Sequence, residues 1–217
     1  MPPRQKQPPT RILIARHGQT ESNRDGLFCG HSETNLTDLG RQQALALGRR
    51  LADLEIAAAF TSDFSRAIET ARLALGERRV PMQVVPDLRE LHYGEWEMQK
   101  ERLIAKSHPE QFQLMRAEDP AWRPPGGETI GEVRRRTSHA LHTIARRHRH
   151  QTVLVVTHGT AINCMLAEVL GMAPEYTFRF DVANCALSEV EARGQKLVVT
   201  LLNDRSHIAG LSSGGAA

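Results

Sequence analysis

The chain has 217 residues, 40% of them hydrophobic and 24% charged, a composition typical of a single globular domain. Its 28 Lys and Arg against 25 Asp and Glu leave a formal charge of +3, so composition indicates no polyanionic partner such as nucleic acid. No stretch approaches the ~18 apolar residues needed to span a bilayer, and three scattered cysteines argue against a disulfide framework. We therefore expect a cytoplasmic protein that binds neither membrane nor nucleic acid.

The first half of the chain alternates predicted strands and helices. Residues 1–10 and 209–217 have little to bury and are expected to be mobile tails around a domain over residues 11–208. Residues 12–15 form a continuous apolar run, the pattern of a strand covered on both faces. After it we expect a helix capped by Thr37, a strand over 57–61, a helix capped by Ser62 or Asp63 and stopped by Gly76, and a weaker strand over 80–85.

Residues 87–128 interrupt this alternation with mixed helical and loop sequence, which we interpret as an insertion above the sheet. A long helix is predicted over 130–144, and its basic runs are interpreted as a solvated face. A buried strand over 152–156, a helix over 160–170 and a hairpin-like pair over 185–190 and 197–202 follow. The pattern predicts an α/β fold, a three-layer α/β/α sandwich with a mostly parallel central sheet.

Two histidines stand where ligands bind in such a fold, beyond the carboxyl ends of the strands. His17 and His158 each follow an apolar strand, and each is followed by a glycine. One such histidine would more often be structural, but a pair beside Arg16 indicates a ligand crevice. Glycines let backbone N–H groups approach an anion, and a guanidinium matches phosphate oxygens, so the pattern favours a phosphate site. Asn23 and Arg66 could contribute further donors.

Taken with their neighbours, these residues resemble motifs of the histidine phosphatase superfamily, which includes cofactor-dependent phosphoglycerate mutases and phosphatases of the alpha-ribazole and broad-specificity types. The resemblance covers nearly the whole folded part, and its order and spacing fit throughout. It rests on RHGQTESN at 16–23, GHS at 30–32, NLTDLG at 35–40, TSD at 61–63 with Arg66, LRE at 88–90, YGEWE at 93–97, PGGE at 125–128, VVTHG at 155–159 and ND at 203–204.

The resemblance implies a catalytic scheme that needs no metal and no cofactor. His17 would attack the phosphoryl group to form a phosphohistidine, and Glu90 would protonate the departing alcohol and then activate water. The phosphate would be held by Arg16, Asn23, Arg66, His158 and Gly159. The two guanidinium charges should lower the pKa of His17 and so favour its neutral, nucleophilic form. The implied partner is a small phosphorylated metabolite.

Two departures from the family pattern bear on the reaction. Leu91 stands where the mutases carry an arginine, and no matching arginine pair appears in the insertion, which favours hydrolysis over phosphoryl shuttling. Met98 replaces a glycine found in many relatives, which leaves the local backbone conformation open. Tyr93 and Trp96 either anchor the core of the insertion or line the substrate pocket.

Three alternatives stay open at this point. The first is a phosphoglycerate mutase, and the second is a non-catalytic phosphate-binding module. A metal-dependent hydrolase is the weakest, because the histidine pairs at 139 and 142 and at 148 and 150 lack a suitably spaced carboxylate. The sequence predicts neither the physiological phosphate ester nor the oligomeric state.

Overall fold

A computed structural model describes residues 7–211 of the chain. Most of the two predicted tails, 1–10 and 209–217, lies outside these residues. Thr10, assigned to the first tail, instead begins strand β1 (Thr10–Arg16), where it pairs with Ala192 and accepts a hydrogen bond from the His150 N–H. Those partners lie far along the chain, so local composition could not indicate them. Within residues 7–211, every helix is too short or too polar to cross a bilayer.

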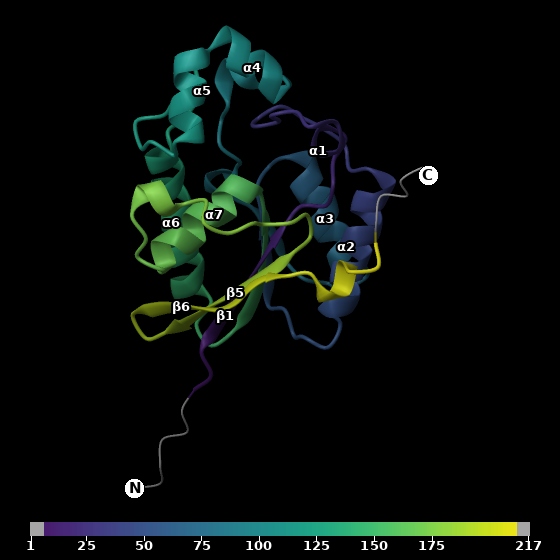
Figure 1. The fold of residues 1–217 in the computed structure, drawn as a ribbon. Helices are drawn as coiled ribbons and strands as arrows, with labels where there is room; N and C mark the ends of the chain where they lie inside the picture. Colours follow the sequence, from purple (N-terminus) through teal and green to yellow (C-terminus); the bar gives the residue numbers. More distant parts are fainter. Residues whose placement is uncertain (1–6, 212–217) are drawn as a thin grey trace, which may run out of the picture.

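The middle layer is a six-stranded sheet in the order β3-β2-β4-β1-β5-β6 (Figure 1). The first four strands in that order are parallel to one another, and β5 runs antiparallel to both of its neighbours. The predicted mostly parallel sheet is therefore present, with the closing hairpin at one edge. Besides β1, the strands are β2 (Ala58–Thr61), β3 (Met82–Val84), β4 (Thr152–Thr157), β5 (Leu187–Arg193) and β6 (Lys196–Asp204).

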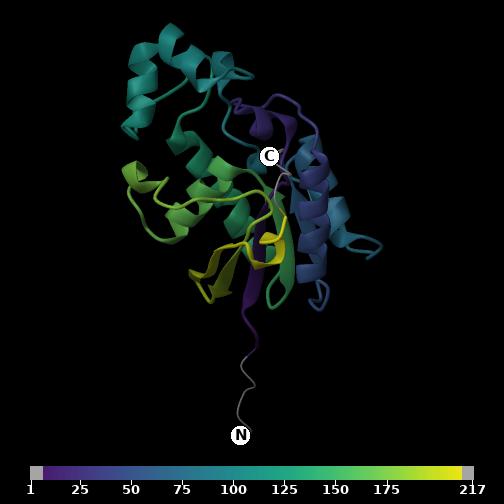
Figure 2. The same ribbon diagram turned by 45° about the vertical axis from the view of Figure 1, so that its right-hand side comes forward.

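Helices cover both faces of the sheet, as Figures 1 and 2 show. One layer holds α2 (Asp38–Arg50) and α3 (Ser65–Leu75), and the other holds α6 (Ile130–Arg147) and α7 (Gly159–Val169). Successive residues of β1 alternate between the layers: Ile12 and Ile14 pack in the cluster that contains α6 and α7, whereas Leu13 packs with α2 and α3. The continuous apolar runs of the sequence thus arise because both faces are covered, and the predicted three-layer sandwich is confirmed.

The predicted insertion forms a cap beyond the carboxyl ends of the parallel strands. It contains α4 (Glu101–Ser107) and α5 (Pro109–Arg116), which project above the sheet in Figure 1. Short helices η1 (Pro86–Leu88) and η2 (Gly94–Trp96) lead into it. Trp96 is fully buried in an apolar cluster with Leu91, so it anchors the cap, whereas Tyr93 packs against this cluster and also lines a cavity. The remaining short helices are α1 (Glu21–Asp25), η3 (Pro174–Tyr176) and η4 (Ser206–Ile208).

The structure changes one local expectation and decides one point that the sequence left open. Phe64, and not Ser62 or Asp63, occupies the N-cap of α3, and its side chain makes no capping hydrogen bond. The side chain of Ser62 contacts His158 and that of Asp63 pairs with Arg89, so neither is available as a cap. Met98 adopts a φ of 58°, the left-handed conformation usual for glycine. The Met98 replacement therefore keeps a glycine-like turn in place.

Candidate active site

A cavity of about 440 Å³ opens at the carboxyl ends of the parallel strands, under the cap. Six of the seven predicted site residues line it: Arg16, His17, Asn23, Arg66, Glu90 and Gly159. His158 does not reach the cavity wall. It is fully buried, and its ring centroid lies 5.1 Å from that of His17. The structure thus brings the predicted residues together from five separate stretches of sequence.

His17 follows β1, and its backbone N–H donates to the Thr157 carbonyl at 2.9 Å. Its ring Nδ1 lies 2.7 Å from the carbonyl oxygen of Gly18, which can only accept, so Nδ1 carries the proton. The lone pair of the neutral ring is therefore on Nε2. Burial lowers the pKa of His17 well below its ordinary value, and the charges of Arg66 and Arg16 lower it further. The direction agrees with the sequence-based expectation, but burial is the larger cause.

His158 is also held as a neutral imidazole. Nε of Arg66 donates to its Nδ1 at 3.3 Å, and because a guanidinium has no acceptor, the ring proton must be on Nε2. That Nε2 lies 2.7 Å from Oγ of Ser62 and donates to it. Burial, followed by the charge of Arg66, holds the pKa of His158 well below its ordinary value. Sequence reasoning assigned Ser62 only a capping role and missed this contact.

The two arginines bring positive charge to the cavity. Arg66 is 1% exposed and donates to the carbonyl oxygens of Gly30 at 2.7 Å and Ser32 at 2.9 Å. Nη1 of Arg16 donates to the Val182 carbonyl at 2.7 Å, while its buried Nε has no partner. Within residues 7–211, neither guanidinium forms an ion pair. A buried, unpaired donor beside a second guanidinium is suited to an oxyanion.

Asn23 is oriented by a residue that sequence reasoning missed. Its Oδ1 accepts hydrogen bonds from the Thr20 N–H at 3.2 Å and from Nδ2 of Asn184 at 3.1 Å. With the oxygen occupied, the amide nitrogen of Asn23 is the end that can donate to a ligand. Asn184 also donates to the carbonyl of His17 at 3.1 Å, so it links the end of β1 to helix α1, which carries Asn23. It lies just before β5, outside any periodic or motif segment.

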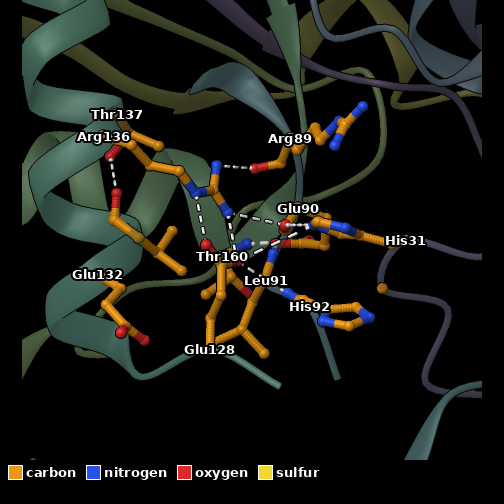
Figure 3. A network of polar contacts seen from close by, with 12 residues as sticks. His31, Arg89, Glu90, Leu91, His92, Glu128, Glu132, Arg136, Thr137 and Thr160 are labelled. Atoms are coloured by element: carbon orange, nitrogen blue, oxygen red, sulfur yellow. Dashed lines mark hydrogen bonds and ion pairs between the residues drawn. The ribbon is translucent and has the colours of Figure 1, made fainter. Parts of the chain in front are cut away.

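Glu90 stands at the cavity wall, held by two backbone N–H groups. Its Oε1 accepts from Leu91 N–H at 2.8 Å and its Oε2 from Thr160 N–H at 3.2 Å (Figure 3). The ring of His31 donates from Nε2 to the Glu90 carbonyl at 2.9 Å. These contacts place the carboxylate between the start of α7 and the cap.

Arg136 fixes the segment that carries Glu90, as Figure 3 shows. Its guanidinium donates to the carbonyl oxygens of Asp87 at 3.0 Å, Arg89 at 2.6 Å and Glu90 at 2.8 Å. It also pairs with Glu128 at 2.8 Å. The interpretation of the 134–136 run as a solvated face is therefore wrong for this residue, because its side chain turns inward under the cap.

The two motif glycines have different roles. The Gly18 N–H donates to Oγ1 of Thr70 at 3.0 Å, and a Cβ at Gly18 would lie 2.4 Å from the Gly40 carbonyl oxygen. Gly18 thus permits close backbone packing, and the expectation that it approaches an anion is wrong. Gly159 begins α7 and lines the cavity, where an added Cβ would meet the Arg16 guanidinium at 3.5 Å. Gly159 keeps its predicted place.

The described residues offer no evident metal centre. Nowhere in 7–211 do three His, Cys, Asp or Glu side chains gather in a way that could hold a metal ion. His148 contacts Gln151 at 3.0 Å, and His150 contacts the Pro8 carbonyl at 2.7 Å, so these two histidines have structural partners at the base of the sheet.

Comparison with known proteins agrees with this geometry. The sequence profile of the histidine phosphatase superfamily (branch 1) matches residues 12–205. The chain belongs to this superfamily. As its motifs predicted, it is a histidine phosphatase, a hydrolase of the same class as relatives named phosphatases. The superfamily match begins within β1 and extends past the end of β6, and so includes every residue of the site described above.

Several relatives match along most of their length. Adenosylcobalamin/alpha-ribazole phosphatase of Escherichia coli is 30% identical over 90% of this chain and 97% of its own. Metal-independent phosphoserine phosphatase of Arabidopsis thaliana is 30% identical over 92% and 84%. The structure of Bacillus stearothermophilus YhfR superposes with a TM-score of 0.89 at 32% identity, covering 92% of this chain and 99% of that one. Proteins named probable phosphoglycerate mutases also match, at 28–30% identity.

Proposed function

We propose that this histidine phosphatase hydrolyses small phosphomonoesters through a phosphohistidine formed on Nε2 of His17. The observation that carries the proposal is the Nδ1 contact to the Gly18 carbonyl, which leaves the neutral ring with its lone pair on Nε2. Arg16 and Arg66 stand beside this ring with no carboxylate partner in the described residues, and they supply the charge that a phosphoryl group requires.

The first step forms a P–N bond and breaks the P–O bond of the ester. Nε2 of His17 donates its electron pair to phosphorus, and the electron pair of the broken bond stays on the alcohol oxygen. The protonated carboxyl of Glu90 gives that oxygen its proton, so a neutral alcohol departs. The Nδ1–H of the phosphorylated ring continues to donate to the Gly18 carbonyl, which stabilises the positive charge that the ring acquires.

The second step reverses the role of Glu90. Its carboxylate accepts a proton from water, the water oxygen attacks phosphorus, and the P–N bond breaks with its electron pair returning to Nε2. Inorganic phosphate leaves, and His17 is again neutral with its proton on Nδ1. We assign the phosphoryl oxygens to four residues that line the cavity: Arg16, Asn23, Arg66 and Gly159. His158 accepts a hydrogen bond from Arg66, and we assign it to the same phosphate site through this contact.

Hydrolysis is favoured over phosphoglycerate isomerisation by the surroundings of Glu90. Leu91 is fully buried in the apolar cluster of the cap, so the position after Glu90 presents no charge to the cavity. Of the residues that line the cavity, Arg16 and Arg66 are the only arginines, and no lysine is among them. A mutase must hold a second anionic end while it protects the phosphoenzyme from water, and this wall offers no group for that end.

The substrate class is a small phosphorylated metabolite. Relatives carry names for alpha-ribazole phosphatase and phosphoserine phosphatase activity, and a cavity of about 440 Å³ accommodates an ester of that size. Three cysteines, free in the structure, suit the reducing cytoplasm in which we expect the protein to act.

The direct test is to trap the phosphoenzyme with a radiolabelled phosphomonoester. Alkaline quenching should preserve the label on the protein and acid quenching should remove it, in the presence of EDTA. His17→Ala should abolish both label and turnover, while His139→Ala, an exposed histidine on α6, should keep both. Full turnover by the His17 variant, or a label stable to acid, would reject the proposal.

A further inference from the structure

Asn163 presents an unused amide at the wall of the active-site cavity. It lies on α7 four residues after Gly159, so the two residues share one face of the helix. Asn163 is 8% exposed and lines the cavity. Its Oδ1 is fully buried and has no hydrogen-bond partner within residues 7–211, so a ligand in the cavity reaches the other end of the amide. Within the same residues Nδ2 makes no hydrogen bond, which leaves it free to donate to an oxygen of the ligand.

Asn163 lies beyond the phosphate end of the cavity. Gly159, one helical turn nearer the strand ends, faces the Arg16 guanidinium, which a Cβ at this position would meet at 3.5 Å, whereas the neighbouring Thr160 contacts Tyr93 and Glu90. Glu90 is the group proposed to protonate the departing alcohol. Asn163, one turn further along α7, therefore lines the cavity away from the Arg16 guanidinium, where the alcohol part of the ester would extend.

The charge around this outer part is negative. Glu101 and Asp181 line the cavity together with Arg16 and Arg66, but the two arginines belong to the phosphate end. Glu101 is 3.6 Å from Arg116, in an exposed pair that screens its charge only weakly, and Asp181 forms no ion pair in the part of the chain that the structure describes. A second acid group on a substrate would be repelled here, whereas a hydroxyl or ammonium group would find acceptors.

The rest of the outer wall is apolar and aromatic, formed by Phe28, Tyr93, Phe178 and Phe180. Phe28 and Tyr93 pack edge to face with ring centroids 5.0 Å apart, so this part of the wall is preformed. Such a surface contacts carbon atoms of an alcohol and supplies no hydrogen-bond partner except the Tyr93 hydroxyl, which already lies 3.4 Å from Oγ1 of Thr160. Asn163, Glu101 and Asp181 are therefore the groups of the outer wall that can select polar substituents on the alcohol.

We propose that Asn163 determines specificity by donating a hydrogen bond from Nδ2 to a hydroxyl oxygen of the leaving alcohol. The carboxylates of Glu101 and Asp181 accept from such hydroxyl groups and repel acids, so the three residues together select phosphomonoesters whose alcohol bears a hydroxyl group and no second acid group. This inference rests on the proposed function, because it assigns the substrate end of the same site.

The first experiment compares two substrates on the wild-type protein. Glycerol 3-phosphate and 3-phosphoglycerate differ only in a hydroxymethyl group against a carboxylate. We expect kcat/KM for glycerol 3-phosphate to be at least about tenfold higher, the change that one hydrogen bond or one repulsive charge typically brings. Equal values, or a preference for 3-phosphoglycerate, would overturn the proposed selection against acids.

The second experiment replaces Asn163 by leucine, which keeps its approximate size and removes the amide. Phenyl phosphate is the reference substrate, since its alcohol carries no additional donor. The ratio of kcat/KM for glycerol 3-phosphate to that for phenyl phosphate should fall about tenfold in Asn163→Leu. An unchanged ratio would overturn the role of Asn163. Failure of the wild-type protein to form a phosphoenzyme with either ester would instead reject the proposed function.

The carboxylates are tested with a matched control. Asp181→Asn and Glu101→Gln should each raise kcat/KM for 3-phosphoglycerate several-fold relative to glycerol 3-phosphate, because each removes a negative charge from the cavity mouth. Glu110→Gln removes an exposed carboxylate of α5 that does not line the cavity, and it should leave the ratio as it is in the wild type. If all three variants shift the ratio equally, or none does, the cavity carboxylates do not select the substrate.

Discussion

The guanidinium of Arg136 donates a 2.8 Å hydrogen bond to the backbone carbonyl of Glu90, the residue proposed to protonate the leaving group. The same side chain reaches two more carbonyls of this segment, those of Asp87 and Arg89. A planar group with several donors can span three carbonyl oxygens at once, and an ammonium cannot reproduce that geometry.

Arg136→Lys should therefore displace Glu90 while keeping the charge. We expect kcat on glycerol 3-phosphate to fall about 10- to 100-fold, the usual effect of misplacing a catalytic group by ~1 Å, with a smaller change in KM. Hydrolysis of p-nitrophenyl phosphate, which needs little protonation, should fall less. Arg135→Lys, on the exposed face of the same helix, serves as the control. Equal losses on both esters would show that Arg136 acts on the whole fold and not through Glu90.

Glu90→Gln should affect substrates according to their leaving groups. Loss of the acid should lower kcat/KM about 10²- to 10⁴-fold for an alkyl phosphate, and far less for p-nitrophenyl phosphate. Steady-state rates on both esters measure the difference. Glu95→Gln, a largely exposed carboxylate on η2, is the comparison variant. If both esters lose the same factor, Glu90 is not the general acid.

The buried histidines should make the protein sensitive to acid. The pKa values of His17 and His158 are lowered in the folded protein, so below the unfolded value of about 6.5 the unfolded chain binds protons that the folded protein does not. The free energy of unfolding should thus be constant above that pH and decrease as the pH falls below it. Urea titrations between pH 8 and 5 measure this slope, and His158→Gln should reduce it. A slope identical to that of wild type would show that His158 titrates normally.

Gly18→Ala should destabilise the fold, because its Cβ would lie 2.4 Å from the Gly40 carbonyl oxygen. Overpacking of this kind costs about 1–3 kcal/mol in the free energy of unfolding. Gly131→Ala is the matched control: it lies in the first turn of α6, where the added Cβ would meet only Thr129 Oγ1, at 3.9 Å. There the better helix propensity of alanine should be neutral or slightly stabilising. Chemical denaturation of both variants provides the comparison, and equal stabilities would argue against the clash.

The ends of the buried strands, and the site residues that follow them, could be predicted from the sequence. Continuous apolar runs identified β1 and β4, and the residues that follow them, His17 and His158, lie 5.1 Å apart between ring centroids. Because both faces of these strands are buried, their residues are apolar, and such a run can be recognised from the sequence alone.

Supporting residues were not readable in the same way. Ser62 looked like a helix cap and Arg136 like a surface charge, because each has the local sequence of that role. Asn184 had no local pattern at all. Their functions follow from partners more than 40 residues away, such as Arg136 with Glu90 or Asn184 with His17. Local propensity carries no information about such distant partners. A long motif does carry this information, but only for the residues that the motif contains.

The antiparallel strand β5 has a consequence for the time at which activity appears during synthesis. It borders β1, and the segment just before it supplies Asn184 to the His17 carbonyl and the Val182 carbonyl to Arg16. Because a chain is translated from its N-terminus, His17 and Arg16 are synthesised well over a hundred residues before the groups that orient them. The proposed nucleophile is therefore oriented only after translation has passed Asn184, and a product that ends before this residue is expected to be catalytically silent.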